Sequence, residues 1–207
     1  MSPVQQPPAR LVVFAKAPVP GSAKTRLIPA LGAVGAAALA QRMLDRTLQH
    51  ALAANVESVE LCMGPAPGHA GWRHVTLPPG LPCTAQGEGD LGERMATAID
   101  RVVRERRQPV VLMGTDCPGL NTELISEAAR QLQAHDAVIV PVADGGYVLI
   151  GLKSPCPELF TAMPWSTSAV AGETLRRLAA LGLSVWLGPM LHDIDEPADL
   201  CHLPPYF

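Results

Sequence analysis

The 207-residue sequence lacks several features that mark particular classes of protein. Its five cysteines are scattered, odd in number and never spaced Cys-x-x-Cys, which argues against a disulfide framework or a zinc site and fits a reducing cytoplasm. Charged residues make up 17% and the formal net charge is -3, so no electrostatic footprint for nucleic acid or an anionic membrane is present. The remaining composition, 48% hydrophobic, is that of a globular protein.

Targeting and membrane signals are also missing from the sequence. The Pro/Gln-rich segment Met1–Arg10 has no apolar core, so we expect no signal peptide, and we expect residues 1–9 to be flexible. The uncharged stretch Leu27–Gln41 is interrupted by proline and glycine and is shorter than the roughly 20 residues that cross a bilayer. No internal repeat is evident. We therefore expect one soluble, cytoplasmic domain over residues 1–207 with no membrane partner.

Apolar runs alternate with helical patterns along the chain. Strands are predicted at residues 11–15, 59–63, 109–113, 137–140, 147–150 and 183–187. Helices are predicted with Leu39, Met43, Leu48 and Leu52 on one inner face, from the capping box Asp90/Glu93 onward, from about Asn121, and over 168–181. This alternation predicts βαβ units and a three-layer α/β fold with a mostly parallel central sheet.

Asp116 directly follows the predicted strand 109–113, in the segment Gly114-Thr115-Asp116-Cys117-Pro118. A carboxylate at the carboxyl end of a buried strand faces the crevice where open α/β sheets bind ligands. The alternative is that Asp116 caps the next helix or shapes the turn, as aspartate often does. The segment alone leaves both interpretations open.

A basic loop follows the first predicted strand. It contains Gly21 and three cations, Lys16, Lys24 and Arg26, within eleven residues. Such a loop suits phosphate, because lysine offers a compact charge and arginine a bidentate fork. It is neither a Walker A sequence nor a Gly-x-Gly-x-x-Gly fingerprint, and a solvated basic loop is the alternative.

Two acidic motifs complete the candidate site. Asp144-Gly145-Gly146 offers glycines that permit close approach of a ligand to the backbone, or forms a tight hairpin. Asp193-Ile194-Asp195 places two carboxylates on one side of an extended segment, where hard oxygen ligands suit Mg²⁺ or Mn²⁺. Capping of the following helix by Asp195 is the alternative, since Pro197 favours a first helical turn.

Together these motifs carry a resemblance to a known family. The matching segments are Phe14-Ala15-Lys16-Ala17-Pro18, Lys24-Thr25-Arg26-Leu27, Gly114–Pro118, Asp144–Tyr147, Pro164-Trp165-Ser166-Thr167 and Asp193–Pro197. From about Leu11 to Leu203 the chain resembles the "transferase 1" family, which is often associated with radical-SAM and selenium-domain genes. That family belongs to the GT-A-like nucleotide-diphospho-sugar transferase superfamily, so the resemblance implies a Rossmann-like, GT-A-like domain.

The resemblance also implies roles for individual residues. The residues implied to bind the nucleotide are Ala15, Lys16, Gly21, Lys24, Arg26, Gln86, Gly89 and Thr115. The implied ligands of Mg²⁺ or Mn²⁺ are Asp116 and Asp195. Catalytic roles are expected for Asp116, Asp144 and Lys24, and substrate contacts for Gly145, Gly146 and Trp165. Trp165 could stack on a sugar or a base, or fill the core.

The function expected first is glycosyl transfer from a nucleoside-diphosphate sugar to a small-molecule acceptor. The segment Thr115-Asp116-Cys117 departs from the Asp-x-Asp of many glycosyltransferases, since it supplies one carboxylate. The alternative is therefore nucleotidyl transfer with release of pyrophosphate, as in the more distantly similar 2-phospholactate and molybdenum cofactor guanylyltransferases. A third hypothesis is nucleotide binding without catalysis.

Overall fold

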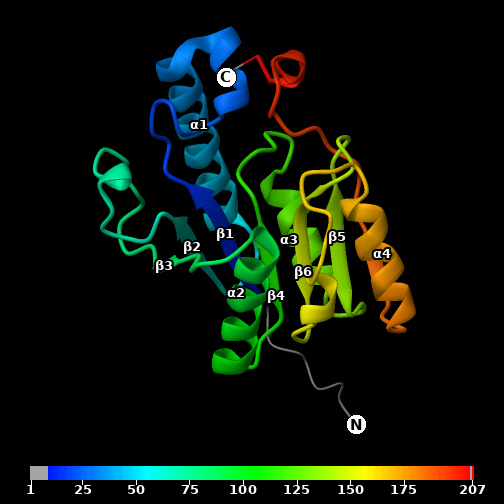
Figure 1. The fold of residues 1–207 in the computed structure, drawn as a ribbon. Helices are drawn as coiled ribbons and strands as arrows, with labels where there is room; N and C mark the ends of the chain where they lie inside the picture. Colours follow the sequence, from blue (N-terminus) through cyan, green and yellow to red (C-terminus); the bar gives the residue numbers. More distant parts are fainter. Residues whose placement is uncertain (1–8, 206) are drawn as a thin grey trace.

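The computed structural model describes residues 9–205 and 207, and its centre is a seven-stranded sheet (Figure 1). The strands are β1 (Arg10–Lys16), β2 (Ser58–Gly64), β3 (Cys83–Ala85), β4 (Val110–Met113), β5 (Ala137–Pro141), β6 (Tyr147–Leu152) and β7 (Val185–Leu187). Their order is β3-β2-β1-β4-β6-β5-β7, and every pairing is parallel except those of β6 with β4 and β5. The expectation of a mostly parallel sheet is confirmed.

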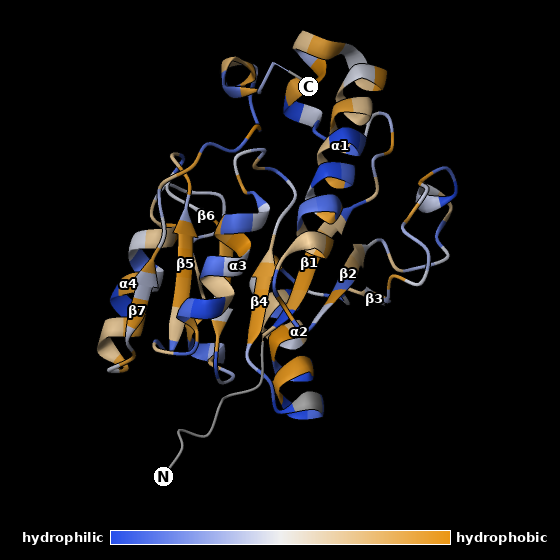
Figure 2. Ribbon diagram, turned by 180° about the vertical axis from the view of Figure 1, so that it is seen from behind, coloured by the Kyte–Doolittle hydropathy of each residue, from blue (hydrophilic) through white to orange (hydrophobic). Residues whose placement is uncertain are grey.

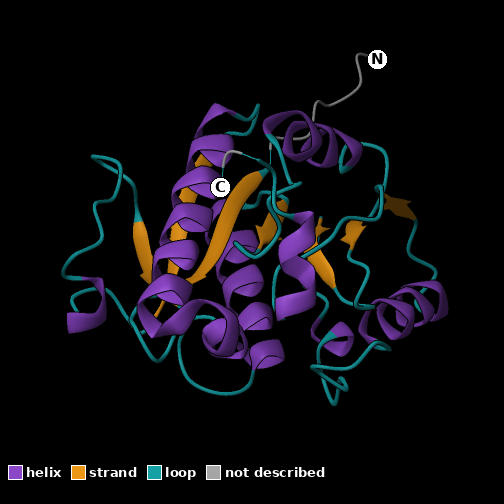
Figure 3. Cartoon of the chain, turned by 90° about the horizontal axis from the view of Figure 1, so that it is seen from above, coloured by secondary structure: helices purple, strands orange, loops and turns teal. Residues whose placement is uncertain are grey.

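Four helices and four short 3-10 helices complete the fold. They are α1 (Ile28–Ala53), α2 (Leu91–Arg106), α3 (Thr122–Gln131), α4 (Val170–Ala180), η1 (Thr25–Leu27), η2 (Ala70–Trp72), η3 (Pro157–Leu159) and η4 (Pro197–His202). One core cluster joins α1 and α3 to the sheet, and a second joins α2 and α4 to it. The strands therefore lie between helices, as the view from above shows, and the predicted three-layer arrangement is confirmed (Figure 3).

Both faces of the central strands are buried, which explains their uninterrupted apolar runs. In β1, Leu11 and Val13 belong to the cluster with α1 and α3, whereas Val12 and Phe14 belong to the cluster with α2 and α4. Figure 2 shows the same pattern as hydrophobic strands inside helices of mixed hydropathy. A parallel strand covered on both faces presents no face to solvent, so its sequence tends to be continuously apolar and does not alternate.

Two details differ from the expectations. Strand β3 was not predicted, because it has three residues, lies at the sheet edge and is exposed or half-buried throughout. Leu52 was expected on the inner face of its helix but is 49% exposed. The inward position one turn after Leu48 is taken by Ala51, which is fully buried, so Leu52 turns toward solvent.

Helix α1 is longer than the uncharged stretch in the sequence suggested. The segment Thr25–Ala53 is long and apolar enough to cross a membrane by length and composition alone. Its second half, however, buries Leu39, Met43, Leu44 and Leu48 within the protein, as the core helix of a globular fold does. Gly32, at φ 70°, interrupts the helical geometry near its start.

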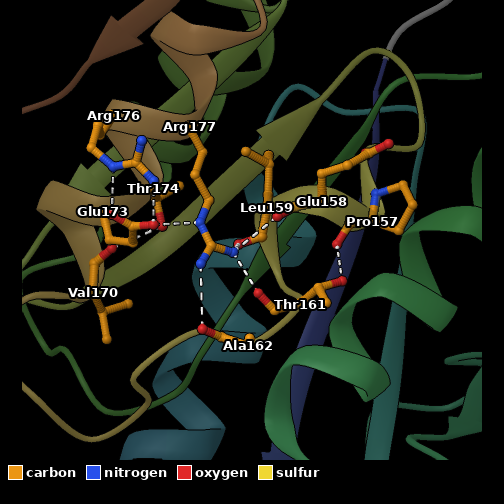
Figure 4. Close-up of polar contacts among 10 residues, drawn as sticks. All are labelled: Pro157, Glu158, Leu159, Thr161, Ala162, Val170, Glu173, Thr174, Arg176 and Arg177. Carbon is orange, nitrogen blue, oxygen red and sulfur yellow. Dashed lines mark hydrogen bonds and ion pairs between the residues drawn. The ribbon is translucent and has the colours of Figure 1, made fainter.

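The irregular segment between β6 and α4 is held by one arginine. Arg177 donates from its guanidinium to the carbonyl oxygens of Glu158, Leu159, Thr161 and Ala162 and pairs with the Glu173 carboxylate (Figure 4). These carbonyls lie outside regular strands, so they need partners from elsewhere. Arg177 thus links α4 to the segment that leads to Trp165.

The N-terminal segment 1–9 was expected to be flexible. Residues 1–8 lie outside the described residues, and Ala9 is buried.

Candidate functional site

The strand order of the sheet has a topological switch point between β1 and β4. From β1 the chain adds β2 and then β3 on one side, and it returns to place β4 on the other side of β1. Such a switch point opens a crevice at the carboxyl ends of the strands, where ligands of open α/β sheets bind. Lys24 follows β1 and Asp116 follows β4, so both belong to this edge.

Lys24 lies at the centre of a charged cluster in the crevice. Its Nζ is 2.7 Å from Oδ1 of Asp116 and 3.6 Å from Oδ1 of Asp195, and it donates to the carbonyl oxygen of Ile194 at 2.6 Å. The Lys24 side chain is 7% exposed, whereas the two carboxylates are 56% and 41% exposed. The ammonium therefore lies beneath two carboxylates that remain open to a ligand.

Arg26 adds a second cation at the outer side of this cluster. Its guanidinium donates to Oδ2 of Asp195 at 2.7 Å and is 59% exposed. The backbone joins the same segments, because the N–H of Ile194 donates to the carbonyl oxygen of Asp116 at 2.8 Å. Segments from three distant parts of the sequence are thus fixed against one another at this edge.

The capping alternatives do not apply to either aspartate. Helix α3 is capped by Asn121, whose side chain accepts from the N–H of Leu124. Helix η4 is capped by Glu196, in a capping box with Asp199. The side chains of Asp116 and Asp195 are instead engaged with cations.

A cavity of 430 Å³ lies beside the cluster and is lined mainly by ionisable groups. Its lining residues are Arg26, Ala143, Asp144, His192, Asp193, Asp195, Glu196, Asp199 and His202. Burial, together with the charges of Asp144, Asp195 and Asp199, raises the pKa of Asp193 above its ordinary value. His192 and His202 stack with ring centroids 3.9 Å apart.

The Asp144-Gly145-Gly146 turn joins the antiparallel strands β5 and β6, so it forms the hairpin that was the alternative expectation. The Asp144 carboxylate accepts from the N–H of Gly146 at 2.7 Å and still lines the cavity. Gly145, at φ 91°, lies so close to the backbone of Ser168 that a Cβ would clash with it. Gly145 is therefore explained by packing against the segment before α4.

A larger cavity of 860 Å³ opens on the other side of the first loop. Lys16 and Gln86 line it, with residues of the connection from β2 to β3 and Arg94 of α2. Its His69, His74 and Arg94 were not singled out from the sequence, because nothing in their spacing marks them.

Several residues expected to contact a nucleotide have evident structural roles. Gln86 is 7% exposed, and its Nε2 donates to the carbonyl oxygens of Ala15 and Cys62, each at 3.1 Å. Ala15 itself is buried. Gly89, at φ 97°, packs against the side chain of Glu93 in the capping box of α2.

The remaining residues expected to contact the nucleotide or the substrate are Gly21, Thr115, Gly146 and Trp165. Gly21 is exposed at φ 81°, a conformation that favours glycine, and Thr115 is half-buried beside Asp116. Gly146 starts the return into β6. Trp165 packs against the core cluster of α2 and α4, and its ring touches the position of Gly92.

The chemistry of the cluster suits a divalent cation, although the described residues contain no ready group of three or more metal-binding side chains. Asp116 and Asp195 supply the hard oxygen ligands that Mg²⁺ and Mn²⁺ take, and one or two carboxylates suffice when substrate phosphates complete the shell. In this structure the Lys24 ammonium lies between them. Burial raises the pKa of Cys117 to about 11, so its thiol is protonated at neutral pH and is a poor nucleophile.

Comparison with known proteins adds three findings. The profile of a family described as uncharacterized proteins conserved in bacteria (DUF2064) matches residues 47–167. A 2-phospho-L-lactate guanylyltransferase of Methanosarcina mazei is 26% identical over 182 residues, 87% of this chain and 80% of that protein. A crystal structure from Desulfovibrio desulfuricans G20, named as a candidate nucleotide-diphospho-sugar transferase, is 35% identical, with a TM-score of 0.84 over 93% of this chain and 84% of that chain.

A more distant structure shares the fold. Rv0371c of Mycobacterium tuberculosis H37Rv, in complex with manganese, has a TM-score of 0.59 and 16% identity over 95% of this chain and 97% of that chain.

Proposed function

The chain belongs to the bacterial DUF2064 family, and on that premise we propose that it is a metal-dependent nucleotidyltransferase. It would transfer a nucleoside monophosphate from a nucleoside triphosphate to a small-molecule acceptor and release pyrophosphate. The observation that carries the proposal is the buried Lys24 ammonium between the Asp116 and Asp195 carboxylates at the sheet's switch point. Similarity to a guanylyltransferase over most of both chains supports this chemistry.

Each group in the crevice has a task in this reaction. Asp116 and Asp195 would hold Mg²⁺ or Mn²⁺, and the bound cation would neutralise charge on the phosphates. Manganese is the cation in the complex of the mycobacterial protein with this fold. Lys24 and Arg26 would supply positive charge for the triphosphate, and Arg26 can hold two phosphate oxygens with its planar fork.

The transfer step itself needs positioning more than proton chemistry. An unprotonated phosphate oxygen of the acceptor attacks the α-phosphorus, the bond from that phosphorus to the bridging oxygen breaks, and pyrophosphate leaves with the electron pair. Asp144, 2.7 Å from the N–H of Gly146 and on the wall of the 430 Å³ cavity, would orient the acceptor. Positive charge gathered around the triphosphate before the transfer step would stabilise the negative charge that develops on the leaving pyrophosphate.

Glycosyl transfer is the second candidate. The Desulfovibrio protein, 35% identical to this chain, is named for nucleotide-diphospho-sugar transfer, and such a reaction would use the same carboxylates and cations. The bond that breaks would then be the one between the sugar and the diphosphate. The products therefore distinguish the candidates: pyrophosphate from a triphosphate, or a nucleoside diphosphate from a nucleotide sugar.

The test is an activity screen with product identification. The protein, with Mn²⁺ or Mg²⁺, is incubated with each of the four ribonucleoside triphosphates and with nucleotide sugars, across a panel of small phosphorylated and hydroxylated acceptors. We expect acceptor-dependent pyrophosphate release from a triphosphate, abolished by Asp116→Asn and retained by Asp100→Asn, which changes a surface carboxylate paired with Arg104. Release of a nucleoside diphosphate from a nucleotide sugar, with none of pyrophosphate, would overturn the proposal in favour of glycosyl transfer.

A further inference from the structure

Lys24 is held in an unusual way for a residue that would bind a substrate. Its ammonium carries three hydrogen atoms and has three oxygen neighbours, on Asp116, Asp195 and Ile194. The Asp116 carboxylate and the Ile194 carbonyl oxygen lie at hydrogen-bond distance, the Asp195 carboxylate lies at ion-pair distance, and the Lys24 side chain is 7% exposed. In this arrangement it neutralises the two carboxylates.

The ammonium also competes with a divalent cation for the negative charge of the same two carboxylates. A cation bridging Asp116 and Asp195 would approach the same Oδ1 atoms that Lys24 contacts, and Mg²⁺ binds oxygen at about 2.0–2.1 Å. An ammonium and a metal ion cannot both occupy that space, and their like charges repel. Each cation therefore weakens the binding of the other to this pair of carboxylates.

The backbone at Lys24 is consistent with a residue that is held and can be released. Lys24 has φ 48° and ψ 47°, a left-handed conformation that is unfavourable for a residue other than glycine. It lies between the loop of the first cations and η1, at a junction of two elements. Arg26, by contrast, contacts only the outer oxygen of Asp195 and does not lie between the carboxylates.

We propose that Lys24 is a resident counter-ion of the Asp116–Asp195 pair, which a divalent cation displaces, and that the released ammonium then binds the nucleotide phosphates. The second half rests on the proposed function; the first half concerns the metal alone. Binding of the metal ion and binding of the nucleotide therefore strengthen each other. The metal ion displaces Lys24 from the carboxylates, and the nucleotide phosphates keep Lys24 away from them. Lys24 is then a positioning residue that couples the two ligands.

The first experiment measures Mn²⁺ binding to the full chain without nucleotide, by electron paramagnetic resonance of the free ion. Lys24→Met removes the competing charge and keeps most of the side-chain volume, so we expect Mn²⁺ to bind at least about tenfold more tightly than to the wild type. Lys16→Met removes a charge from the same loop without touching the pair, and its affinity should stay within about twofold. Unchanged or weaker binding to Lys24→Met, or no binding to either protein at millimolar Mn²⁺, would overturn the proposal.

A second measurement uses the wild type alone, so it does not depend on how the variant folds. The rate of Lys24 acylation by an amine-reactive ester is followed by mass spectrometry, with Lys153 as an internal reference at a remote surface hydrogen bond. Saturating Mn²⁺ should accelerate modification of Lys24 several-fold relative to Lys153, and a triphosphate analogue added with Mn²⁺ should slow it again. Protection of Lys24 by Mn²⁺ alone would contradict displacement.

The counter-ion role of Lys24 and the proposed nucleotidyltransferase activity can be tested separately. If Lys24→Met tightens Mn²⁺ binding while no nucleotide is turned over, the counter-ion role stands and nucleotidyl transfer fails. If triphosphates are turned over but Mn²⁺ affinity is the same in Lys24→Met and wild type, the enzyme assignment stands and the counter-ion role fails.

Discussion

Glu60 and Lys24 are both charged and both buried, but their surroundings give them different tasks. Glu60 is fully buried in β2 and is bound by the guanidinium groups of Arg10 and Arg101 and by the hydroxyl of Thr84. None of these groups lines either cavity. Lys24 instead lies beneath two carboxylates open to solvent. We therefore assign Glu60 to stability and Lys24 to ligand exchange.

Glu60 leads to a prediction about stability in acid. Burial alone would raise its pKa, but the hydrogen bond and charge of Arg101 and the charge of Arg10 outweigh burial, so the pKa of Glu60 lies below the ordinary 4.5. The stabilisation is therefore complete above about pH 4.5 and is lost as the pH falls through the lowered folded-state pKa. Glu60→Gln leaves two guanidinium groups without their anion, and should cost about 3 kcal/mol at neutral pH.

This pH dependence is tested by urea unfolding between about pH 3 and pH 7, which spans the ordinary pKa of a glutamate. The difference between wild type and Glu60→Gln should be largest at neutral pH and should shrink toward pH 3. The surface variant Glu127→Gln, which removes an exposed ion pair with Arg130 on α3, provides the control and should change the unfolding free energy far less than Glu60→Gln does. A constant difference at every pH would show that Glu60 is not stabilised as the carboxylate.

Among the connecting elements, the β5–β6 turn makes a prediction through one glycine. Gly145→Ala places a Cβ against the backbone of Ser168 and forces φ 91° on an alanine, so we expect a loss of at least about 2 kcal/mol. Gly21→Ala is the matched control, since φ is 81° there but nothing lies within 4 Å of the added carbon. It should cost only about 1 kcal/mol. Equal losses in urea unfolding would mean that contact with Ser168 does not constrain the turn.

Helix α4 makes a second prediction through Arg177. Arg177→Lys keeps the charge but replaces a planar fork, bonded to four carbonyls and to Glu173, with a single ammonium. We expect a loss of about 2 kcal/mol in unfolding free energy. Arg176→Lys, which changes an exposed partner of the same Glu173, should cost much less than Arg177→Lys. Similar losses of unfolding free energy for the two variants would show that the hydrogen bonds of Arg177 do not hold α4 in place.

The central strands could be predicted because both of their faces are buried, as in β1, where every residue from Leu11 to Ala15 is apolar and buried. Strand β3 could not, since three residues at a sheet edge bury too little to leave a pattern. The nearness of Lys24 and Asp116 follows from the rule that carboxyl ends of parallel strands meet at one edge, whereas Asp195 was placed beside Asp116 by the family resemblance. The structural role of Gln86 could not be read, because its partners Ala15 and Cys62 lie 71 and 24 residues away.

For the molecule as a whole, the fold places a basic loop, two aspartates and two cavities along one edge of one sheet. Ligands that bind only the folded chain stabilise it, by about 2.7 kcal/mol at a hundred times the dissociation constant. The C-terminal segment contributes to this edge, because Ile194 packs with Leu27 and Leu39 in a small third core cluster near the end of the chain. Nucleotide binding and stability of this edge should therefore rise together.

The central claim is tested most directly by titrating a non-hydrolysable nucleoside triphosphate into the full chain by calorimetry, with Mn²⁺ and with a chelator. We predict binding that requires Mn²⁺ and that weakens at least about tenfold in Asp116→Asn, while Asp100→Asn binds as the wild type does. Binding that is equally tight in the chelator, or equally tight in Asp116→Asn, would contradict a metal and nucleotide site at the carboxyl end of β4.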